Sequence, residues 1–383
     1  MPNSNKKKLL ILIEWFSPGY KAGGPIQSCV NMCIALKESY EIYVLTTDTD
    51  HGETMPYTDV TVNEWGLHND VGVQVFYMEK QKASYQQLAY QIKQIDADFV
   101  CINLLFSPMF ALYPLWLKHT KKINGQLVIS PRGSLYDSAI SLKWYKKKPL
   151  LFILKSLGFY RQVIFHATNK REKEAVLKYF PNNKIGIADN LPDILLPPFV
   201  SNEKTAGSLR CIFVARIVPI KNLLFLIELL AAVQQTVTLT IVGPIENEAY
   251  WLACEKAIEK LPAHITINYI GAKKNAELLG LLQQHHLFVL PTTGENFGHA
   301  IFESFRAGRP VLISDQTPWV NLAQQGIGWD LPLTDKPAFI NALEAAAAWN
   351  QEQYDSFALA SYTYASNFIH NPSLIQPYHQ LFL

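Results

Sequence analysis

Short apolar runs alternate with longer segments whose apolar residues recur at helical spacing, and this pattern extends over most of the chain. Such alternation is typical of open parallel sheets covered by helices. In the first half, the expected strands are Leu9–Glu14, Glu41–Thr46, Val71–Tyr77, Asp98–Leu104, Gln126–Ser130 and Val163–Thr168. The expected helices between them include Pro25–Lys37, Tyr85–Ile95 and Lys170–Tyr179.

A polar stretch rich in proline, residues 189–208, interrupts this pattern and is typical of an interdomain linker. The alternation then restarts, with expected strands Leu209–Ala215, Val237–Val242, Ile265–Ile270, His286–Leu290 and Pro310–Ser314. The expected helices are Asn222–Gln234, Glu248–Glu259, Asn275–Gln284 and Gly298–Ala307, and the tail from Ala342 to Leu383 is mostly helical.

The pattern predicts an α/β protein with two doubly wound domains. We expect an N-terminal domain over residues 1–190, a linker over 191–208, a C-terminal domain over 209–365, and a C-terminal helix over 366–383 that packs back on the N-terminal domain. In such folds a ligand binds outside the carboxyl ends of the strands, here in a cleft between the domains.

Composition supports a globular protein. Apolar residues make up 49% of the chain and charged residues 17%, which excludes disordered, collagen-like and coiled-coil classes. The five cysteines are odd in number and form no Cys-x-x-Cys pair. They are expected to be reduced core thiols of a cytosolic protein rather than a disulfide framework or zinc site.

Two apolar stretches bear on membrane location. The run after Lys6–Lys8 is too short for the core of a signal peptide. The uncharged stretch from Phe99 to Leu117 is long enough to span a membrane, but Asn103, Ser107 and two prolines divide it. We therefore expect a strand, a loop and a helix there.

The most specific signal is the stretch from Leu290 to Ser304, in which a strand ends, a loop carries Glu295, and Gly298 opens a helix that holds Glu303. Backbone N–H groups around residues 296–298 would then point from a helix N-terminus, which suits an anion. Glu295 would accept hydrogen bonds from sugar hydroxyls, and Glu303 could take both hydroxyls of a ribose. The alternative is that one glutamate caps the helix and the other is solvated.

A second signal is the segment from Phe213 to Asn222, in which a strand ends at Arg216 and Lys221 begins the next helix. Both cations would project from the carboxyl edge of the sheet. Two fixed cations can stabilise the charge that develops on a diphosphate leaving group without a metal ion. The alternative is a surface Arg and Lys with no shared ligand.

A third signal is the loop from Trp15 to Pro25, which follows the first strand and contains Gly23 and Gly24. Paired glycines allow a phosphate or sugar to approach the backbone closely. The loop lacks the Gly-x-Gly-x-x-Gly pattern of dinucleotide-binding folds, and a plain tight turn is the alternative.

Together these segments resemble the retaining glycosyltransferases of family 4, the glycosyl transferases group 1 with the GT-B fold. The resemblance rests on Glu295 and Glu303 within the Glu-Asn-Phe-Gly-His-Ala-Ile-Phe-Glu-Ser stretch, on Arg216 and Lys221, and on the glycine loop. The turn at Val242-Gly243-Pro244 fits as well. Similarity extends along nearly the whole chain and is more specific in the second half.

The resemblance implies transfer of a sugar from a UDP- or GDP-sugar to a glycan or lipid-linked acceptor, with the anomeric configuration retained, in synthesis of a bacterial-type surface polysaccharide or glycoconjugate. Glu295, Arg216 and Lys221 would act in catalysis, with no cofactor and no metal expected. The donor would be bound by Glu303, Gly23, Gly24, Asn296, Phe297, Gly298 and Gly243. The second domain would hold the donor and the first the acceptor.

The acceptor side departs from the family pattern, because no histidine follows the fourth strand of the first domain. Asn103, Ser107 and Arg132 are the candidates for this side, although a polar residue at a strand end need not bind anything. The sequence leaves the sugar, the nucleotide base, the acceptor and the oligomeric state open.

Short metal-binding patterns also occur. Asp48-Thr49-Asp50 and Asp96-Ala97-Asp98 match the Asp-x-Asp of metal-dependent transferases, but such matches recur by chance, and we expect solvated turns. His166 and His299 are expected to be structural imidazoles whose ring nitrogens are satisfied, because no cluster has zinc-ligand spacing.

Positive charge is concentrated in the first half, where residues 1–200 contain 23 Lys and Arg against 17 Asp and Glu. Lys143 to Lys148, with Trp144 and Tyr145, precede an apolar run, which suits an anionic membrane surface. A solvated lysine face over a core helix is the alternative. We expect no nucleic-acid partner, because no recognition motif accompanies the charge.

These patterns predict a cytoplasmic enzyme, with peripheral attachment to the inner face of a membrane as an option. Two other functions stay open, namely a sugar-nucleotide epimerase with the same fold and a non-catalytic subunit that binds a nucleotide sugar.

Overall fold

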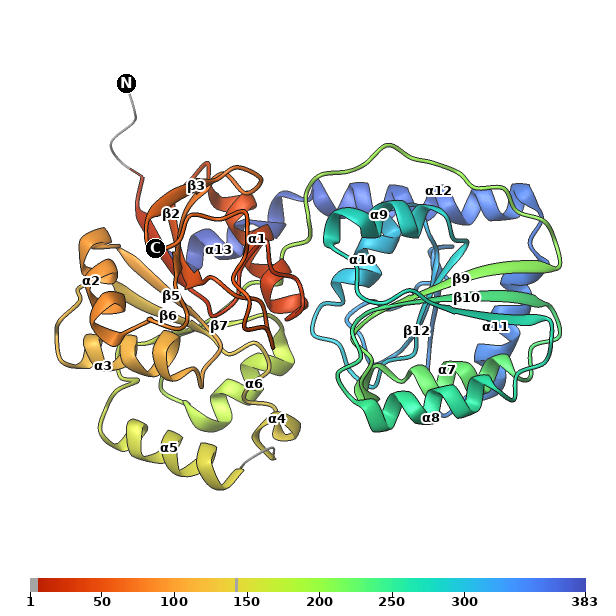
Figure 1. Cartoon of the computed structure of the whole chain (residues 1–383). Coiled ribbons are helices and arrows are strands. Elements are labelled where there is room, and N and C mark those ends of the chain that lie inside the picture. Colours follow the sequence, from red (N-terminus) through yellow and green to blue (C-terminus); the bar gives the residue numbers. More distant parts are fainter. Residues whose placement is uncertain (1–5, 142–143) are drawn as a thin grey trace. The chain divides into compact units, whose positions relative to one another are not determined.

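The computed structural model describes residues 6–141 and 144–383, which form two compact units (Figure 1). The N-terminal unit comprises the chain up to Leu191 together with Pro372–Leu383, and the C-terminal unit comprises Pro192–Asn371. The stretch expected to be a linker, residues 191–208, therefore lies almost entirely in the C-terminal unit. The chain end belongs to the N-terminal unit from residue 372 rather than 366.

The N-terminal unit is built on an eight-stranded sheet of order β3-β4-β2-β1-β5-β6-β7-β8. Only the β3–β4 pair is antiparallel. The strands are β1 (Lys8–Leu12), β2 (Glu41–Thr47), β3 (Trp65–His68), β4 (Val73–Met78), β5 (Phe99–Asn103), β6 (Gln126–Ser130), β7 (Ile164–Ala167) and β8 (Ile185–Ile187). The helices are α1 (Gly24–Leu36), α2 (Tyr85–Ile95), the π-helix η1 (Pro108–Leu112), α3 (Tyr113–His119), α4 (Asp137–Ser141), α5 (Trp144–Ser156) and α6 (Lys170–Tyr179).

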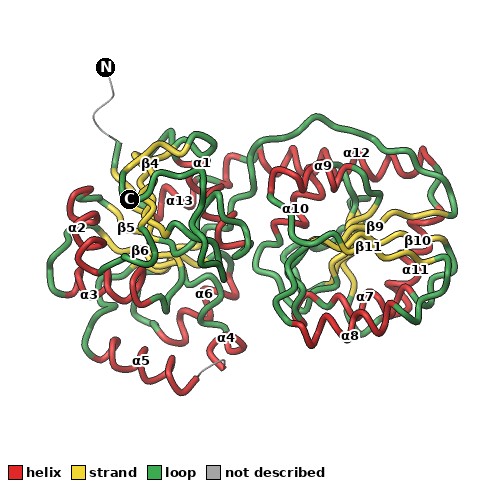
Figure 2. The backbone as a smooth tube through the Cα atoms, in the orientation of Figure 1, coloured by secondary structure: helices red, strands yellow, loops and turns green. Residues whose placement is uncertain are grey.

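Strand β1 shows why the sheet is buried on both faces. Leu9 and Ile11 belong to one hydrophobic cluster, whereas Leu10 and Leu12 belong to another. Because successive side chains of a strand point to opposite faces, each cluster fills one side of the sheet. The continuous apolar run in the sequence therefore reflects a central parallel strand covered on both faces. Figure 2 shows the strands of this unit (yellow) between helices (red), with α2 and α3 on one side and α1 and α13 (Gln376–Leu381) on the other.

The C-terminal unit contains a fully parallel six-stranded sheet of order β11-β10-β9-β12-β13-β14. The strands are β9 (Ser208–Val214), β10 (Thr236–Val242), β11 (Ile265–Tyr269), β12 (Leu287–Leu290), β13 (Val311–Ser314) and β14 (Gly328–Leu331). The helices are η2 (Pro219–Lys221), α7 (Leu223–Leu230), α8 (Glu248–Ile258), α9 (Asn275–Gln283), α10 (His299–Arg306), α11 (Lys336–Ala348) and α12 (Gln351–Ile369).

Each sheet has a point at which the chain reverses its direction of travel across the strands. In the C-terminal unit the chain runs from β9 outward to β10 and β11, and it then returns to the other side of β9 as β12. In the N-terminal unit the equivalent point lies between β1 and β5. The loops after the two central strands diverge at such a point, which leaves room for a ligand beyond the carboxyl edge.

The end of the chain packs against the N-terminal sheet through η3 (Pro372–Leu374) and α13 (Gln376–Leu381). The Tyr378 hydroxyl donates to the Asp189 carbonyl at 2.9 Å. Leu381 lies so close to Gly186 that a Cβ there would come within 2.8 Å of its Cδ1 atom. A glycine in β8 therefore lets the final helix lie directly on the strand.

Several elements differ from the sequence prediction. The short strands β3, β8 and β14 and the helix α4 were not predicted, and α5 forms where a helix was given as the alternative for the basic run. The helix expected over 222–234 is shorter: it begins at Leu223, because Asn222 adopts a left-handed conformation (φ 60°) after the 3₁₀ turn η2, and it already ends at Leu230. Lys221 therefore ends a 3₁₀ turn rather than beginning a helix.

The apolar stretch Phe99–Leu117 forms β5, η1 and most of α3, as its polar and proline residues predicted. Among the described residues, no helix is both long and apolar enough to cross a membrane. All five cysteines are buried and unpaired, so the prediction of free core thiols is confirmed.

Candidate active site

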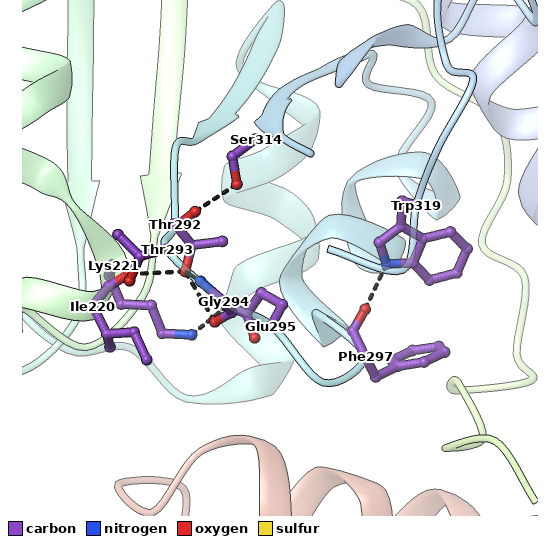
Figure 3. Close-up of polar contacts among 9 residues, drawn as sticks. All are labelled: Ile220, Lys221, Thr292, Thr293, Gly294, Glu295, Phe297, Ser314 and Trp319. Carbon is purple, nitrogen blue, oxygen red and sulfur yellow. Dashed lines mark hydrogen bonds and ion pairs between the residues drawn. The ribbon is translucent and has the colours of Figure 1, made fainter. Parts of the chain in front are cut away.

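An ion pair marks the switch point of the C-terminal sheet. The Lys221 ammonium, at the end of η2 after β9, contacts the Glu295 carboxylate in the loop after β12 (Figure 3). Because β9 and β12 are neighbours in the sheet, the loops after them meet at the same edge. Both side chains are largely buried, with exposed fractions of 15% and 13%. The structure thus brings together two of the three residues predicted to act in catalysis.

Backbone and hydroxyl contacts hold these two loops together. The Ile220 carbonyl accepts hydrogen bonds from the Thr292 hydroxyl at 2.9 Å and from the Thr293 backbone N–H at 2.8 Å. The Ser314 hydroxyl at the end of β13 donates to the Thr292 carbonyl, and the Glu295 N–H donates to the Gln316 carbonyl at 3.1 Å. The loop that carries Glu295 is therefore fixed from both sides before any ligand binds.

Arg216 lies two residues beyond the end of β9, not at the strand end itself. Its guanidinium forms an ion pair with Glu246 at 2.9 Å, and 41% of its side chain is exposed. The two predicted cations are thus held by different carboxylates. A phosphate that binds Arg216 competes only with a solvent-accessible pair, whose net stability is small.

Gly243 lies at the carboxyl end of β10, next to the loop that holds Arg216. Its φ is 148°, and a Cβ there would come within 1.9 Å of the Ala215 carbonyl oxygen. A side chain at this position would separate the two loops. Gly243 is therefore required for close backbone packing at the edge, whether or not it also contacts a ligand.

The start of α10 depends on Gly298, which is the N-cap in a left-handed conformation (φ 79°). A Cβ there would come within 2.7 Å of Ile301 Cδ1. Phe297 is buried, and its carbonyl accepts a hydrogen bond from the Trp319 indole N–H (Figure 3). Asn296 precedes it on the turn that leads into the helix. The turn before α10 is therefore held by the buried Phe297 side chain and by the hydrogen bond from Trp319.

Glu303 lies more than one turn inside α10, as predicted, and differs from Glu295 in its surroundings. No described residue forms an ion pair with its carboxylate or donates a hydrogen bond to it. Burial raises the pKa of Glu303 to about 7, and the Asp193 carboxylate acts in the same direction, whereas Arg306 opposes them. Arg306 pairs with Asp193 at 2.9 Å instead.

Two polar atoms of residues close to Glu303 in α10 also lack partners. The Ser304 hydroxyl and the Arg306 Nε atom are buried and have no hydrogen-bond partner. Buried polar atoms without partners are uncommon and call for an explanation. The carboxylate and these two atoms show that this part of α10 is incompletely satisfied without a ligand.

The predicted residues of the N-terminal unit lie at the carboxyl edge of its own sheet. Gly23 is the N-cap of α1 (φ 67°), with open space where a Cβ would lie, and Gly24 begins that helix. Asn103 ends β5 and accepts hydrogen bonds from Arg132, which follows β6. Ser107 caps η1 by accepting from the Phe110 N–H at 3.3 Å, so its hydroxyl has a structural role.

The Asp-x-Asp prediction needs a correction. Asp48 and Asp50 are not solvated, because only 4% and 6% of each residue is exposed. Asp50 accepts from the backbone N–H groups of Tyr20 and Lys21, at 2.8 and 3.1 Å, and therefore holds the loop that precedes the glycine pair. In the second pattern, Asp96 and Asp98 are exposed.

His166 is a structural imidazole, as predicted. Its Nδ1 atom is 2.8 Å from the Ser130 hydroxyl, and its Nε2 atom is 2.8 Å from the Ala188 carbonyl. Burial lowers the pKa of His166 to about 3. Among the described residues, no three His, Cys, Asp or Glu side chains form a group that could hold a metal ion.

The sequence prediction did not include several residues that shape the site. Thr292 and Thr293 bind the η2 turn, Gln316 holds the Glu295 backbone, and Glu246 pairs with Arg216. The two threonines could have been found, since they follow the apolar strand directly. Gln316 and Glu246 gave no signal, because their roles depend on loops that approach only in the folded chain.

Several solved glycosyltransferase structures share the fold of this chain. HepE from Anabaena, solved with UDP and glucose, superposes with a TM-score of 0.66 at 15% identity over 98% of both chains. A sucrose-phosphate synthase from Thermosynechococcus elongatus superposes with a TM-score of 0.65 at 14% identity, also over 98% of both chains. For WaaG, a glycosyltransferase of lipopolysaccharide biosynthesis, the TM-score is 0.61 at 14% identity over 98% of both chains.

The fold of this chain is therefore GT-B, with two Rossmann-like parallel-sheet domains, as predicted. Residues 199–347 match the family model described as glycosyl transferases group 1, so the C-terminal unit carries the domain of that family. No curated protein matches the chain. The family match is confined to the C-terminal unit, and the matching family is one of glycosyltransferases.

Proposed function

We propose that this protein transfers a sugar from a UDP- or GDP-sugar to a glycan or lipid-linked acceptor, with retention of the anomeric configuration and without a metal ion. The observation that carries the proposal is the Lys221–Glu295 ion pair at the switch point of the C-terminal sheet. It puts a cation and an acceptor of hydrogen bonds side by side where such folds bind ligands. The solved HepE structures contain UDP, UDP-glucose or UDP with glucose, which favours a nucleotide-sugar donor here.

The proposed chemistry breaks the bond between the sugar C1 atom and the diphosphate oxygen. Negative charge develops on the leaving diphosphate, and Lys221 and Arg216 are the cations that would stabilise it. Glu295, released from Lys221 when that cation turns to the phosphate, would accept hydrogen bonds from the transferred sugar. An acceptor hydroxyl forms the new bond on the same face of C1 and gives its proton to the leaving diphosphate.

Glu303 would bind the nucleoside. No residue that the structure describes donates to its carboxylate, and the two hydroxyls of a ribose are donors of the kind it lacks. The backbone around residues 296–298 would add N–H groups toward the phosphates.

A thermal-shift titration with UDP, GDP and their glucose and mannose derivatives tests the donor class. We expect one base to stabilise the wild type, and Glu303→Ala to lose most of that shift. The control is Glu228→Ala, which removes a carboxylate that pairs with Lys336 away from these loops. No shift with either base would reject the proposal. An epimerised donor formed without acceptor would instead favour the epimerase, and binding without turnover would favour the non-catalytic subunit.

The proposal includes peripheral attachment to an anionic membrane surface through α5. Its outward side chains are apolar, since Phe152 and Ile153 are 73% and 52% exposed and Tyr145 is 59% exposed. At 100° per residue these side chains form one face, and the exposed Lys146 and Lys148 lie on either side of it. An exposed apolar stripe between lysines matches a surface of anionic headgroups over acyl chains. Lys143, the first residue of the predicted basic run, lies outside the described residues.

Flotation with vesicles tests this surface. The full chain should bind vesicles containing phosphatidylglycerol more strongly than pure phosphatidylcholine vesicles. Phe152→Ser with Ile153→Ser should reduce binding at every salt concentration, whereas Lys146→Gln with Lys148→Gln should reduce it chiefly at low salt. The matched control is Leu252→Ser with Leu359→Ser, which changes two leucines of similar exposure in the C-terminal unit. Equal binding by the double serine variant and the wild type would reject the surface.

A further inference from the structure

Arg132 combines three features that together suit a residue with a functional role. It is not a glycine but has a left-handed backbone (φ 52°), it is partly buried, and no described carboxylate forms an ion pair with it. Strained backbone conformations persist where the surrounding structure holds them, and they concentrate at functional sites. Leu104, which follows the neighbouring strand β5, is also left-handed (φ 73°). The carboxyl edge near the N-terminal switch point therefore carries two such residues on adjacent strands.

Two neutral side chains hold the Arg132 guanidinium. Its Nε and Nη2 atoms donate to the Asn103 amide oxygen at 3.3 and 3.2 Å, and its Nη1 atom donates to the Asn190 amide oxygen. Asn103 and Asn190 are themselves buried. These contacts fix the direction of the guanidinium but leave its positive charge uncompensated. They also use only three of its five N–H groups.

The acids on the neighbouring elements do not neutralise this charge. Glu172, on α6, directs one carboxylate oxygen to the Gly133 N–H at 2.6 Å and the other to the Thr168 N–H and hydroxyl. Asp189 precedes Asn190, and it too forms no ion pair with Arg132. A partly buried cation without an opposite charge is costly, so a partner that supplies the charge is expected.

Arg309 provides an internal comparison, because it is also buried without a carboxylate. All five of its N–H groups have acceptors, so it has nothing left to offer a ligand. These acceptors are the carbonyls of Leu282, Gly308, Val200 and Gln283 and the hydroxyl of Tyr354. Lys204 is similar, since its ammonium donates to the carbonyls of Thr205, Ala347 and Trp349. Arg132 alone among these three keeps unused donors.

We propose that Arg132 binds an anionic group of the acceptor, a phosphate or a carboxylate, through its two remaining N–H groups. That the anion belongs to a sugar acceptor rests on the proposed function. The anion site itself does not depend on it. The two asparagines hold the guanidinium in place, and an oxyanion can then take a bidentate contact at no further ordering cost to the side chain. The acceptor would thus carry negative charge near its reacting hydroxyl.

The test titrates inorganic phosphate into the full chain, followed by thermal shift and by ³¹P NMR line broadening, with saturating UDP present to occupy the donor site. The wild type should bind phosphate. Arg132→Gln should weaken that binding at least tenfold, and Arg132→Lys, which keeps the charge but not the planar fork, should weaken it severalfold. The matched control is Arg161→Gln, an exposed arginine of the same unit, which should bind as the wild type does.

A malonate titration distinguishes the two anions, because stronger competition by malonate would favour a carboxylate. Phosphate binding by both Arg132 variants at the wild-type level would overturn the inference. Loss of phosphate binding in Lys221→Gln alone would also overturn it, because the phosphate would then occupy the donor site. If the chain binds no UDP, the proposed donor function fails, while the phosphate titration still reports on Arg132. If Arg132→Gln does not fold, the lysine variant decides.

Discussion

Glu295 and Glu303 belong to one loop-and-helix segment, but the fold gives them opposite surroundings. Glu295 is held by a buried lysine from the neighbouring loop. Glu303 accepts no hydrogen bond from the described part of the chain, and burial raises its pKa to about 7. The comparison shows that the spacing of two acids in a sequence does not define their roles. Glu295 would be released to the sugar when Lys221 turns to the phosphate. Glu303, which accepts no hydrogen bond within the described residues, would instead gain most from a ligand that donates hydrogen bonds to it.

The largest effect is expected for Glu295→Ala. Turnover should fall by about 10²–10³ or more, because the variant loses the group that would face the transferred sugar. The fold should survive, since the loop is also held by Thr292, Thr293 and Gln316. Initial rates of sugar transfer would measure the fall in turnover, and unfolding curves would check that the variant is folded. Glu228→Ala is the control. Full activity in Glu295→Ala would remove this residue from catalysis.

The cations come next. Lys221→Ala should slow transfer by a few kcal/mol of barrier, and Arg216→Ala by less, because the Arg216 side chain is 41% exposed and its charge is screened. Single-turnover rates would separate this from donor binding. Lys336→Ala, which breaks the exposed pair with Glu228, should leave the rate unchanged. Wild-type rates in both Lys221→Ala and Arg216→Ala would refute their assignment to the diphosphate.

For Glu303→Ala we expect weaker donor binding with a smaller change in the rate at saturating donor. Two lost hydrogen bonds to a carboxylate correspond to about tenfold or more in Kd. Calorimetric titration with the nucleoside diphosphate would give this value. We assign donor binding to Glu303 and catalysis to Glu295. If both variants change the donor Kd and the turnover rate in the same ratio, this assignment is wrong.

The raised pKa of Glu303 makes the same contrast testable by proton release on donor binding. Ribose hydroxyls would favour the charged carboxylate, so donor binding near pH 6.5 should release part of one proton from Glu303. Calorimetry in buffers of different ionisation enthalpy would detect it, and Glu303→Gln should release none from this group. Constant release in both proteins would mean that Glu303 does not contact the ligand.

Stability should show a smaller, related effect of pH. Between its ordinary pKa of 4.5 and the folded value of about 7, Glu303 stays protonated in the folded chain but ionises in the unfolded one. Rising pH therefore removes stability over this range, by at most a few kcal/mol, with no further loss above about 7. Denaturant unfolding should show the wild type losing stability relative to Glu303→Gln from pH 5 to pH 8. A constant difference between the two proteins would contradict the raised pKa.

Most of the fold could be predicted from the sequence, because it depends on local patterns. Buried parallel strands such as β1 and β12 consist of continuous apolar residues, and α2 and α6 match their predicted bounds. The strands that were missed, β3, β8 and β14, are short edge strands whose formation depends on a neighbour. The helix start at Gly298 and the close approach at Gly243 could be proposed, since glycine is the residue that such positions need.

The sequence by itself determined the residue types at the carboxyl edges of both sheets, because strand ends and turns are encoded by nearby residues. Only the tertiary structure decided which charges meet. It paired Lys221 with Glu295 and Arg216 with Glu246, gave Glu303 no donor among the described residues, and held Arg132 between two asparagines. These partners come from loops separated by tens of residues or more, and Coulomb and desolvation energies depend on distance and burial in space rather than along the chain.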